Sequence, residues 1–167
     1  MHTYHIPGQG NQQMEYMSQE GYDKLVAELY QLENVEYPRV RDALVEARDK
    51  GDLSENYEYR AARREQSRLL GRIRFKQKVL EHARVLDTKR LRPDVVGLLC
   101  KVEITNMGNG SQMTYMIVNP HEANLQEKKI SIKSPITQAL LGKKVGDVVE
   151  VHVPAGTLTL RIDNITL

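Results

Sequence analysis

The chain has 167 residues, of which 40% are hydrophobic and 5% aromatic, with one Phe and no Trp. A folded core is therefore aliphatic and modest in size, and the length suits two small domains better than one. The formal net charge of +2 excludes a protein that coats nucleic acid, so electrostatic function must come from local clusters of charge. The sole cysteine, Cys100, has no intramolecular disulfide partner, which is typical of a reducing compartment.

Residues 1–13 show no apolar periodicity, and Pro7, Gly8 and Gly10 argue against a helix, so we expect a disordered tail here. This start also lacks the basic and apolar regions of a signal peptide. No apolar run in the chain is long enough to span a bilayer. The sequence therefore predicts a cytoplasmic protein that makes no contact with a membrane.

Two long amphipathic segments follow, separated by a short interruption at residues 51–59. Their apolar residues recur at spacings of three and four, which is the pattern of a helical seam. The first segment carries Tyr22, Leu25, Leu29 and Leu32 at these spacings, and the second carries Leu69, Ile73, Leu80 and Ala83. Helices joined by so short a turn pack antiparallel, so the pattern predicts a coiled-coil hairpin over residues 14–88.

The first helix carries its own start and bend signals. Ser18 stands just before the apolar repeat and is suited to be the N-cap, because its hydroxyl can accept from a free backbone N–H. Pro38 lies inside the helical pattern and is expected to kink the helix. Beyond it, Ala43 and Ala47 would let the two helices approach closely near the turn.

A stripe of basic residues runs along the second helix at intervals of four residues. It consists of Arg60, Arg64, Arg68, Arg72 and Lys76, with Arg63, Arg74 and Lys78 alongside. Like charges at this spacing repel by roughly a few tenths of a kcal/mol per pair, so the stripe needs compensation. Two explanations stay open: pairing with acidic residues of the first helix, or a basic surface that follows RNA phosphates.

The turn between the two helices is acidic. Asp52 followed three residues later by Glu55 fits a capping box at the start of the second helix, with Ser54 as a competing N-cap. The helix dipole favours such negative residues in any first turn. The same pair also suits a metal, because Mg²⁺ needs only one or two protein carboxylates beside water and phosphate oxygens.

The helical period ends at residues 87–93, and residues 89–92 before Pro93 are expected to form an interdomain linker. Short β-rich runs follow, separated by turn signals. They span residues 95–105, 113–118, 129–133, 148–153 and 158–165. Between the third and the fourth, Ser134, Pro135 and Gly142 frame one short helix. Residues 93–167 are therefore expected to form an antiparallel sheet with one short helix, which makes the fold class α+β.

No arrangement of residues typical of an independent enzyme stands out. Ser, His and Asp are scattered, and the sequence has neither a phosphate-binding glycine loop nor a cysteine pair for zinc. We therefore expect that the chain does not catalyse a reaction alone.

Two stretches carry a family resemblance. Residues 46–63, EARDKGDLSENYEYRAAR, resemble the tip of the bacterial Gre transcript cleavage factors, and the GreA-like branch fits best. Residues 130–136, ISIKSPI, together with 141–147, are similar to the C-terminal domain of that family. The resemblance covers residues 14–167 and implies an N-terminal antiparallel coiled coil followed by an FKBP-like domain.

The resemblance implies a transcription elongation factor that enters the secondary channel of RNA polymerase and stimulates endonucleolytic cleavage of backtracked nascent RNA. It implies that Asp52 and Glu55 assist this reaction and hold Mg²⁺ jointly with the polymerase, which supplies the catalytic centre. Further positions match the family as support of the tip, Asn56, Glu58 and Tyr59, and as a basic patch for RNA, Arg48, Arg60, Arg63 and Arg64.

The partners that the resemblance implies are bacterial RNA polymerase and the 3′ end of the nascent RNA, with the chain acting as a monomer. Some relatives regulate or inhibit polymerase without promoting cleavage, and this is the alternative function. Tyr57 departs from the small residue common at this point in GreA-like tips. An FKBP-like fold also raises prolyl isomerase activity, but this domain offers only Tyr115 for the aromatic pocket such a site needs.

Overall fold

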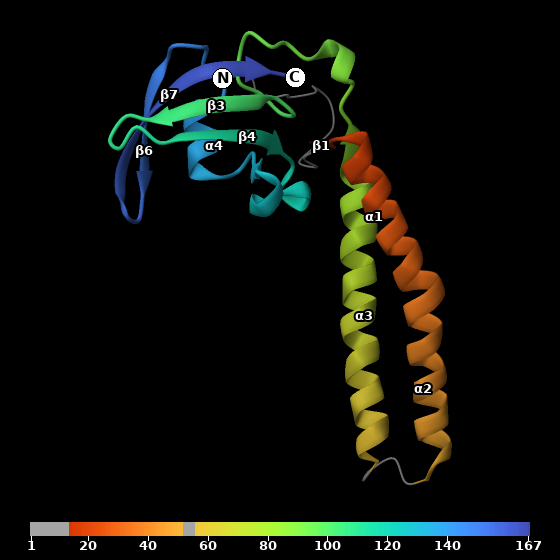
Figure 1. Cartoon of the computed structure of the whole chain (residues 1–167). Coiled ribbons are helices and arrows are strands. Elements are labelled where there is room, and N and C mark those ends of the chain that lie inside the picture. Colours follow the sequence, from red (N-terminus) through yellow and green to blue (C-terminus); the bar gives the residue numbers. More distant parts are fainter. Residues whose placement is uncertain (1–13, 52–55) are drawn as a thin grey trace. The chain divides into compact units, whose positions relative to one another are not determined.

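The computed structural model describes residues 14–51 and 56–167. The expected tail at residues 1–13 lies outside the described residues. The chain divides into two compact units (Figure 1). We call Tyr22–Ala83 the helical unit, and Met1–Gly21 together with Arg84–Leu167 the sheet unit. Residues 14–21 and 84–88, which we expected in the hairpin, thus group with the sheet unit.

Two antiparallel arms make the helical unit, as the seam pattern predicts. The first arm comprises α1 (Gln19–Gln31), a π-helical turn η1 (Leu32–Glu36) and α2 (Tyr37–Asp49), and the second is α3 (Tyr57–His82). Figure 1 shows α2 and α3 side by side. Leu32, Val40, Leu69 and Ile73 form the buried cluster between the arms. The predicted hairpin is confirmed.

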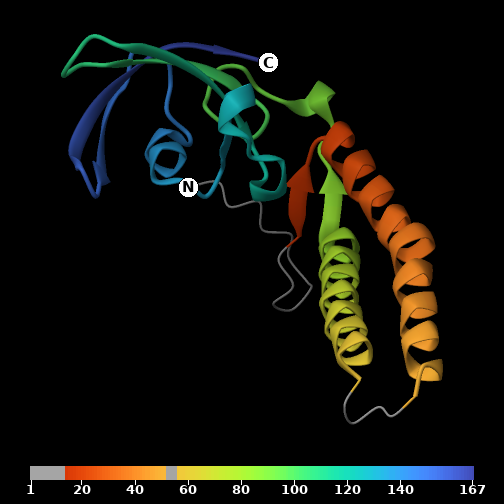
Figure 2. The same cartoon turned by 60° about the horizontal axis from the view of Figure 1, so that its bottom comes forward.

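The bend expected at Pro38 takes the form of a wider helical turn just before the proline. The N–H of Tyr37 donates to the carbonyl of Leu32, five residues back, which is the π-helical bond. A proline ring would clash with the carbonyl four residues back in a regular α-helix, and the wider turn relieves that clash. Pro38 then occupies the first turn of α2, where its missing N–H is not needed. The first arm changes direction at this point (Figure 2).

A five-stranded sheet in the order β5-β4-β3-β7-β6 forms most of the sheet unit. The strands are β3 (Lys101–Asn106), β4 (Gln112–Val118), β5 (Lys129–Ser131), β6 (Val148–Val153) and β7 (Gly156–Thr166). The expectation of an entirely antiparallel sheet is wrong for one pair, because β5 runs parallel to β4. The chain between them passes through η3 (Pro120–Glu122) and η4 (Leu125–Glu127) and re-enters the sheet in the same direction.

One face of the sheet is covered by α4 (Pro135–Leu140), whose N-cap Ser134 accepts from the N–H of Thr137 at 3.1 Å, as predicted. The aliphatic core includes Val102, Ile104, Ile117, Leu140, Val151, Leu160 and Ile162. The first expected strand begins late, at Lys101, because Leu99 has φ of 66° and Cys100 closes a turn onto Gly97. The α+β class, a helical hairpin followed by an antiparallel-dominated sheet with one short helix, is confirmed. Among the described residues, no helix has the length and apolar character to cross a bilayer.

Strand pairing and hydrogen bonds hold the first described residues in the sheet unit. β1 (Glu15–Met17) pairs with β2 (Ala83–Val85) in a two-stranded sheet that the sequence did not predict. The Asn119 amide donates to the carbonyl of Tyr16 at 3.1 Å. Ser18 caps α1 by accepting from the Gly21 N–H at 3.0 Å, as predicted. The backbone N–H of Ser18 donates to Glu122 Oε2 at 3.1 Å, and its hydroxyl donates to the same carboxylate.

We expect Gly21→Ala to lower the free energy of unfolding by about 1 kcal/mol. A Cβ at Gly21 would lie 2.3 Å from Cδ of Glu122, so the carboxylate would have to leave Ser18 and lose charge-assisted hydrogen bonds. Gly71→Ala is the matched control, because nothing lies within 4 Å of its Cβ position and Ala favours a helix by about 1 kcal/mol. Urea unfolding followed by circular dichroism measures both, and a stabilised Gly21→Ala protein would contradict the prediction.

Candidate functional site

The site predicted at the tip of the hairpin lies between the end of α2 and the start of α3. Asp52 and Glu55, the two carboxylates expected to act there, lie outside the described residues together with Ser54. On the α2 side, the Lys50 N–H donates to the Ala47 carbonyl at 3.3 Å. Gly51 follows with φ of 136°, a conformation that residues with a side chain rarely adopt. The chain therefore leaves α2 abruptly at a glycine.

Asn56 closes the hairpin on both sides. Its Oδ1 accepts from the backbone N–H of Tyr59 at 2.9 Å, which makes it the N-cap of α3. Its Nδ2 donates to the carbonyl of Ala47 at 2.6 Å, near the end of α2. One side chain thus satisfies a free donor of one helix and an acceptor of the other.

The cap at Asn56 corrects the capping hypothesis. We expected Asp52 or Ser54 to cap the second helix, but α3 begins at Tyr57 and takes its cap from Asn56. The hypothesis is wrong because an asparagine directly before the first helical residue already accepts from the third backbone N–H. The N-cap of α3 is therefore Asn56, and the structure of the acidic turn before it lies outside the described residues.

The other residues expected to support the tip lie in the first turn of α3. Lys50 Nζ donates to Glu58 Oε2 at 3.1 Å across the turn, and this hydrogen bond to the carboxylate raises the pKa of Lys50. Both groups are exposed to solvent, so the pair contributes little to stability. Tyr59 is half-buried. Tyr57 is 78% exposed, and the guanidinium of Arg60 lies 5.7 Å from the centre of its ring, in cation–π range.

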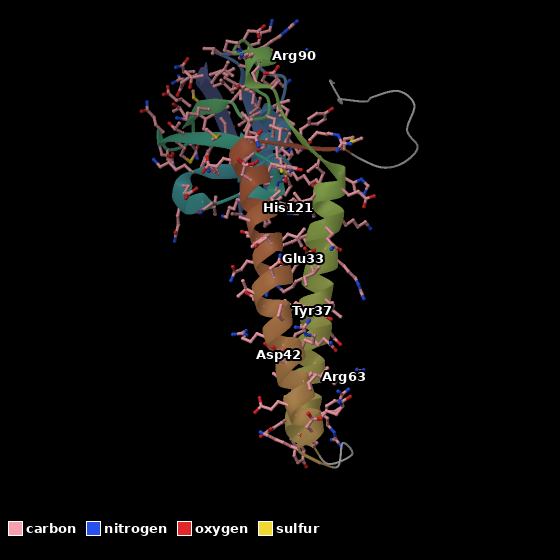
Figure 3. The ribbon with its side chains drawn as sticks, turned by 90° about the vertical axis from the view of Figure 1, so that its right-hand side faces the viewer. Glu33, Tyr37, Asp42, Arg63, Arg90 and His121 are labelled. Atoms are coloured by element: carbon pink, nitrogen blue, oxygen red, sulfur yellow. The ribbon has the colours of Figure 1, made fainter. Side chains whose placement is uncertain are left out.

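The basic stripe of α3 divides into two parts. Farther from the tip, Arg72 pairs with Glu36 at 3.8 Å and Lys76 pairs with Glu28 at 2.8 Å, both on the first arm. Nearer the tip, Arg63, Arg64 and Arg68 line a shallow surface depression with Ser67. Figure 3 shows Arg63 in the tip-proximal part of the hairpin. Within residues 14–51 and 56–167, no carboxylate pairs with Arg63, Arg64 or Arg68.

The two explanations for the stripe therefore apply to different segments. The part farther from the tip is compensated by acidic residues of the first arm, as in other coiled coils. The tip-proximal part leaves three guanidinium groups on one exposed face, available to anionic groups of a partner. Arg48, in the last turn of α2, is also exposed. Together with Arg60 in the first turn of α3, these arginines lie on the parts of the two helices that are nearer the turn.

Two family models match the chain in succession. The model "Transcription elongation factor, N-terminal" matches residues 15–85, and "Transcription elongation factor, GreA/GreB, C-term" matches residues 91–167. The chain belongs to the GreA/GreB transcription elongation factor family. The family resemblance expected from the tip and from the C-terminal motif is confirmed, and it extends over both units of the structure.

Curated relatives agree with this assignment. "Transcription elongation factor GreA" of Christiangramia forsetii is 46% identical over 147 residues, which cover 88% of this chain and 93% of the relative. The protein of the same name in Rhodospirillum rubrum is 46% identical over 141 residues, covering 84% and 90%. The solved structure of GreA factor homolog 1 from Thermus thermophilus is 28% identical, covers 93% of this chain and has a TM-score of 0.44.

Proposed function

We propose that this chain is a cytoplasmic transcription elongation factor that stimulates cleavage of backtracked nascent RNA by bacterial RNA polymerase. Family membership supports the class of function. The observation that supports the mechanism is the cap at Asn56, because α3 takes its N-cap from a residue other than the two carboxylates of the acidic turn. The polymerase provides the catalytic centre, and the factor completes it.

The hairpin contributes a narrow arm that ends in an acidic turn. Asp52 and Glu55 offer carboxylate oxygens, the ligand type that Mg²⁺ prefers, and two such groups suit an ion that keeps its remaining waters and phosphate ligands. When bound jointly with the polymerase, Mg²⁺ would supply activation of water and stabilisation of the leaving oxygen in phosphodiester hydrolysis. Two carboxylates are too few to hold the ion alone, so we propose that the factor has no activity on free RNA.

The residues behind the turn position it. Asn56 joins the start of α3 to the Ala47 carbonyl, and Lys50 and Glu58 add an exposed pair across the same turn. We propose that this bonding fixes the two helix ends that flank the acidic turn. Fixed placement matters because a catalytic group that is displaced by about 1 Å loses much of its effect.

The tip-proximal arginines suit the RNA. Arg48, Arg60, Arg63 and Arg64 were predicted as a basic patch, and Arg68 continues it along α3. Guanidinium groups bind phosphate oxygens in a bidentate manner, independent of base sequence. We propose that this patch holds the displaced 3′ segment of the transcript beside the acidic turn.

The function is tested with a stalled, backtracked elongation complex of a bacterial polymerase. Addition of the purified chain should shorten the transcript from its 3′ end, and the same chain should leave naked RNA intact. Cleavage of naked RNA would contradict the assignment to polymerase. Binding to the complex without shortening would favour the alternative, a polymerase-binding regulator without cleavage activity.

Neutralising the tip-proximal arginines should weaken the stimulation of transcript cleavage. We expect Arg63→Gln, Arg64→Gln and Arg68→Gln together to raise the factor concentration for half-maximal cleavage about tenfold, with a smaller dependence on salt. The control is compared per charge removed: Arg72→Gln with Lys76→Gln removes two charges of the same helix, which already pair with Glu36 and Glu28. Titrations at two salt concentrations measure both proteins. Equal losses of cleavage per charge removed in the two proteins would mean that the total positive charge of the helix, and not the tip-proximal patch, supports cleavage.

A further inference from the structure

The strand β6 ends the sheet with an open edge. It pairs with β7 on one side in a continuous register from Val148 to Val153. On its other side, no strand and no further backbone hydrogen bond reaches β6 from the described part of the chain. Figure 1 shows it as the outermost strand of the sheet. An edge of six residues without proline or lysine is a template for pairing with another strand.

The opposite edge of the same sheet is protected. β5 has only three residues, and its first residue, Lys129, exchanges two backbone hydrogen bonds of 2.9 Å with Asn124. The 3₁₀ turn η4 follows Asn124 directly, so the chain itself occupies this side. Short strands and covering loops are the usual means by which proteins block an edge. Only the β6 edge lacks such protection among the described strands of this sheet.

The backbone groups of β6 alternate in direction. The carbonyl of Asp147 accepts from the N–H of Ile162 in β7 at 2.9 Å. Successive residues of an antiparallel strand point their N–H and C=O to opposite sides. Val149, Val151 and Val153 therefore bond to β7, as Asp147 does. Glu150 and His152 direct their N–H and C=O groups to the open edge.

The side chains of β6 alternate as well. Val149 and Val151 are buried on the face that α4 covers. Glu150 and His152 are exposed on the other face. The Nδ1 atom of His152 lies 3.1 Å from Oγ1 of Thr157, so Nε2 is the ring nitrogen that this contact does not use.

We propose that β6 pairs antiparallel with β6 of a second copy of this chain, about a twofold axis at Val151. In this register Glu150 of each copy stands opposite His152 of the other, on the same exposed face. The two residues of such a pair exchange two backbone hydrogen bonds, so the twofold arrangement forms four. It also forms two Glu–His contacts, and the sheet becomes continuous across both copies.

Other registers of the two β6 strands are less favourable, either because of the groups that they set opposite each other or because of the faces on which the side chains lie. A slip of two residues sets Glu150 opposite Glu150, where like charges are destabilising, or His152 opposite His152, which leaves no carboxylate opposite the imidazole ring. A slip of one residue sets Glu150 opposite Val151, although these side chains lie on different faces of the strand. The sequence of β6 is thus complementary to itself in one register.

The interface is small, so the association is weak and reversible. At low concentration the chain is therefore a monomer, the form expected on the polymerase. We expect dissociation constants between about 10 µM and about 1 mM. Sedimentation velocity of the full chain across this range should show conversion from monomer to dimer.

Charge variants test the register. Glu150→Lys should raise the dissociation constant about tenfold or more, because the carboxylate that accepts from the His152 ring of the other copy would be replaced by a second hydrogen-bond donor. The swap Glu150→His with His152→Glu should restore association, since it exchanges the two members of each pair. Glu103→Lys is the matched control, with the same charge change on the exposed face of β3, away from the edge. Association of Glu150→Lys equal to that of the wild type would overturn the proposal.

Amide hydrogen exchange gives a readout at single residues. In the dimer, the N–H groups of Glu150 and His152 should gain protection as concentration rises. Those of Val149 and Val151 bond to β7 and should be protected at every concentration. A monomeric wild type at about 1 mM, or a dimer without protection at Glu150 and His152, would exclude pairing through β6. Neither result depends on transcript cleavage.

Discussion

Asp52→Asn and Glu55→Gln are each expected to lower polymerase-dependent transcript cleavage about 100-fold while the protein stays folded. Asn and Gln keep the size of the side chains but lose the negative charge that Mg²⁺ needs. A metal contributes several kcal/mol to stabilisation of the transition state, and about 2.7 kcal/mol corresponds to 100-fold in rate. Cleavage is measured as the first-order rate of transcript shortening at saturating factor.

The loss of cleavage in these two variants should not be accompanied by a loss of stability. The cap of α3 is Asn56, so neither substitution removes it, and we expect the free energy of unfolding to change by less than about 0.5 kcal/mol. The variants should compete with the wild type for polymerase. Raised Mg²⁺ should recover part of the rate, because the remaining carboxylate still provides a weaker site.

Glu58→Gln is the matched control for loss of an acidic group near the tip. Glu58 pairs with Lys50 in solvent, so its removal should reduce cleavage less than about threefold. If the control loses as much activity as the Asp52 and Glu55 variants, general negative charge would explain the effect. Near-normal cleavage by both variants at low Mg²⁺ would exclude the metal role.

The hairpin could be predicted because its seam repeats over many turns. Leu32, Leu69 and Ile73 are buried where the apolar periodicity places them, and Val40 packs with them. A periodic pattern reports burial over a long segment, so one irregular turn does not hide it. The π-helical turn before Pro38 was beyond prediction in detail, since a proline signals a disturbed helix without saying how the backbone relieves the clash.

Elements held by distant contacts were predicted incompletely or not at all. β1 has three residues, too few for a periodic pattern, and was missed, whereas β5 was expected within residues 129–133 but its direction was not. β5 runs parallel to β4 because the connection through two 3₁₀ turns brings the chain back into the sheet in the same direction, and the sequence shows no signal for that path. The contacts of Ser18 with Glu122 join residues 104 positions apart. Local propensity carries no information about such partners.

The cap of α3 was missed because a stronger local pattern stood nearby. Asp52 and Glu55 have the spacing of a capping box, whereas Asn56 is followed at the corresponding position by Tyr59. The signal that would have identified Asn56 is its own residue type, since asparagine is among the best N-caps without a reciprocal partner. Its second bond, to Ala47, requires knowledge of the hairpin itself.

Asn56→Ala is expected to destabilise the hairpin by about 2 kcal/mol. The substitution removes the acceptor for the Tyr59 N–H, a cap with a contribution of about 1 kcal/mol, and the donor to the Ala47 carbonyl, which contributes a similar amount. Transcript cleavage should fall as well, because the acidic turn loses its fixed attachment to the two helices. Unlike the loss in Asp52→Asn, this loss should accompany reduced stability and should not recover with Mg²⁺.

Asn56→Asp separates the two bonds. Aspartate caps a helix as well as asparagine, so the Tyr59 N–H keeps its acceptor, but a carboxylate cannot donate to the Ala47 carbonyl. We therefore expect a loss of about 1 kcal/mol, half that of Asn56→Ala. Urea unfolding gives the two values, and hydrogen exchange at Tyr59 reports the cap directly: the amide should stay protected in Asn56→Asp and exchange faster in Asn56→Ala. If Asn56→Asp is as stable as the wild type, the bond to Ala47 contributes nothing, and placement of the acidic turn would have to depend on other contacts.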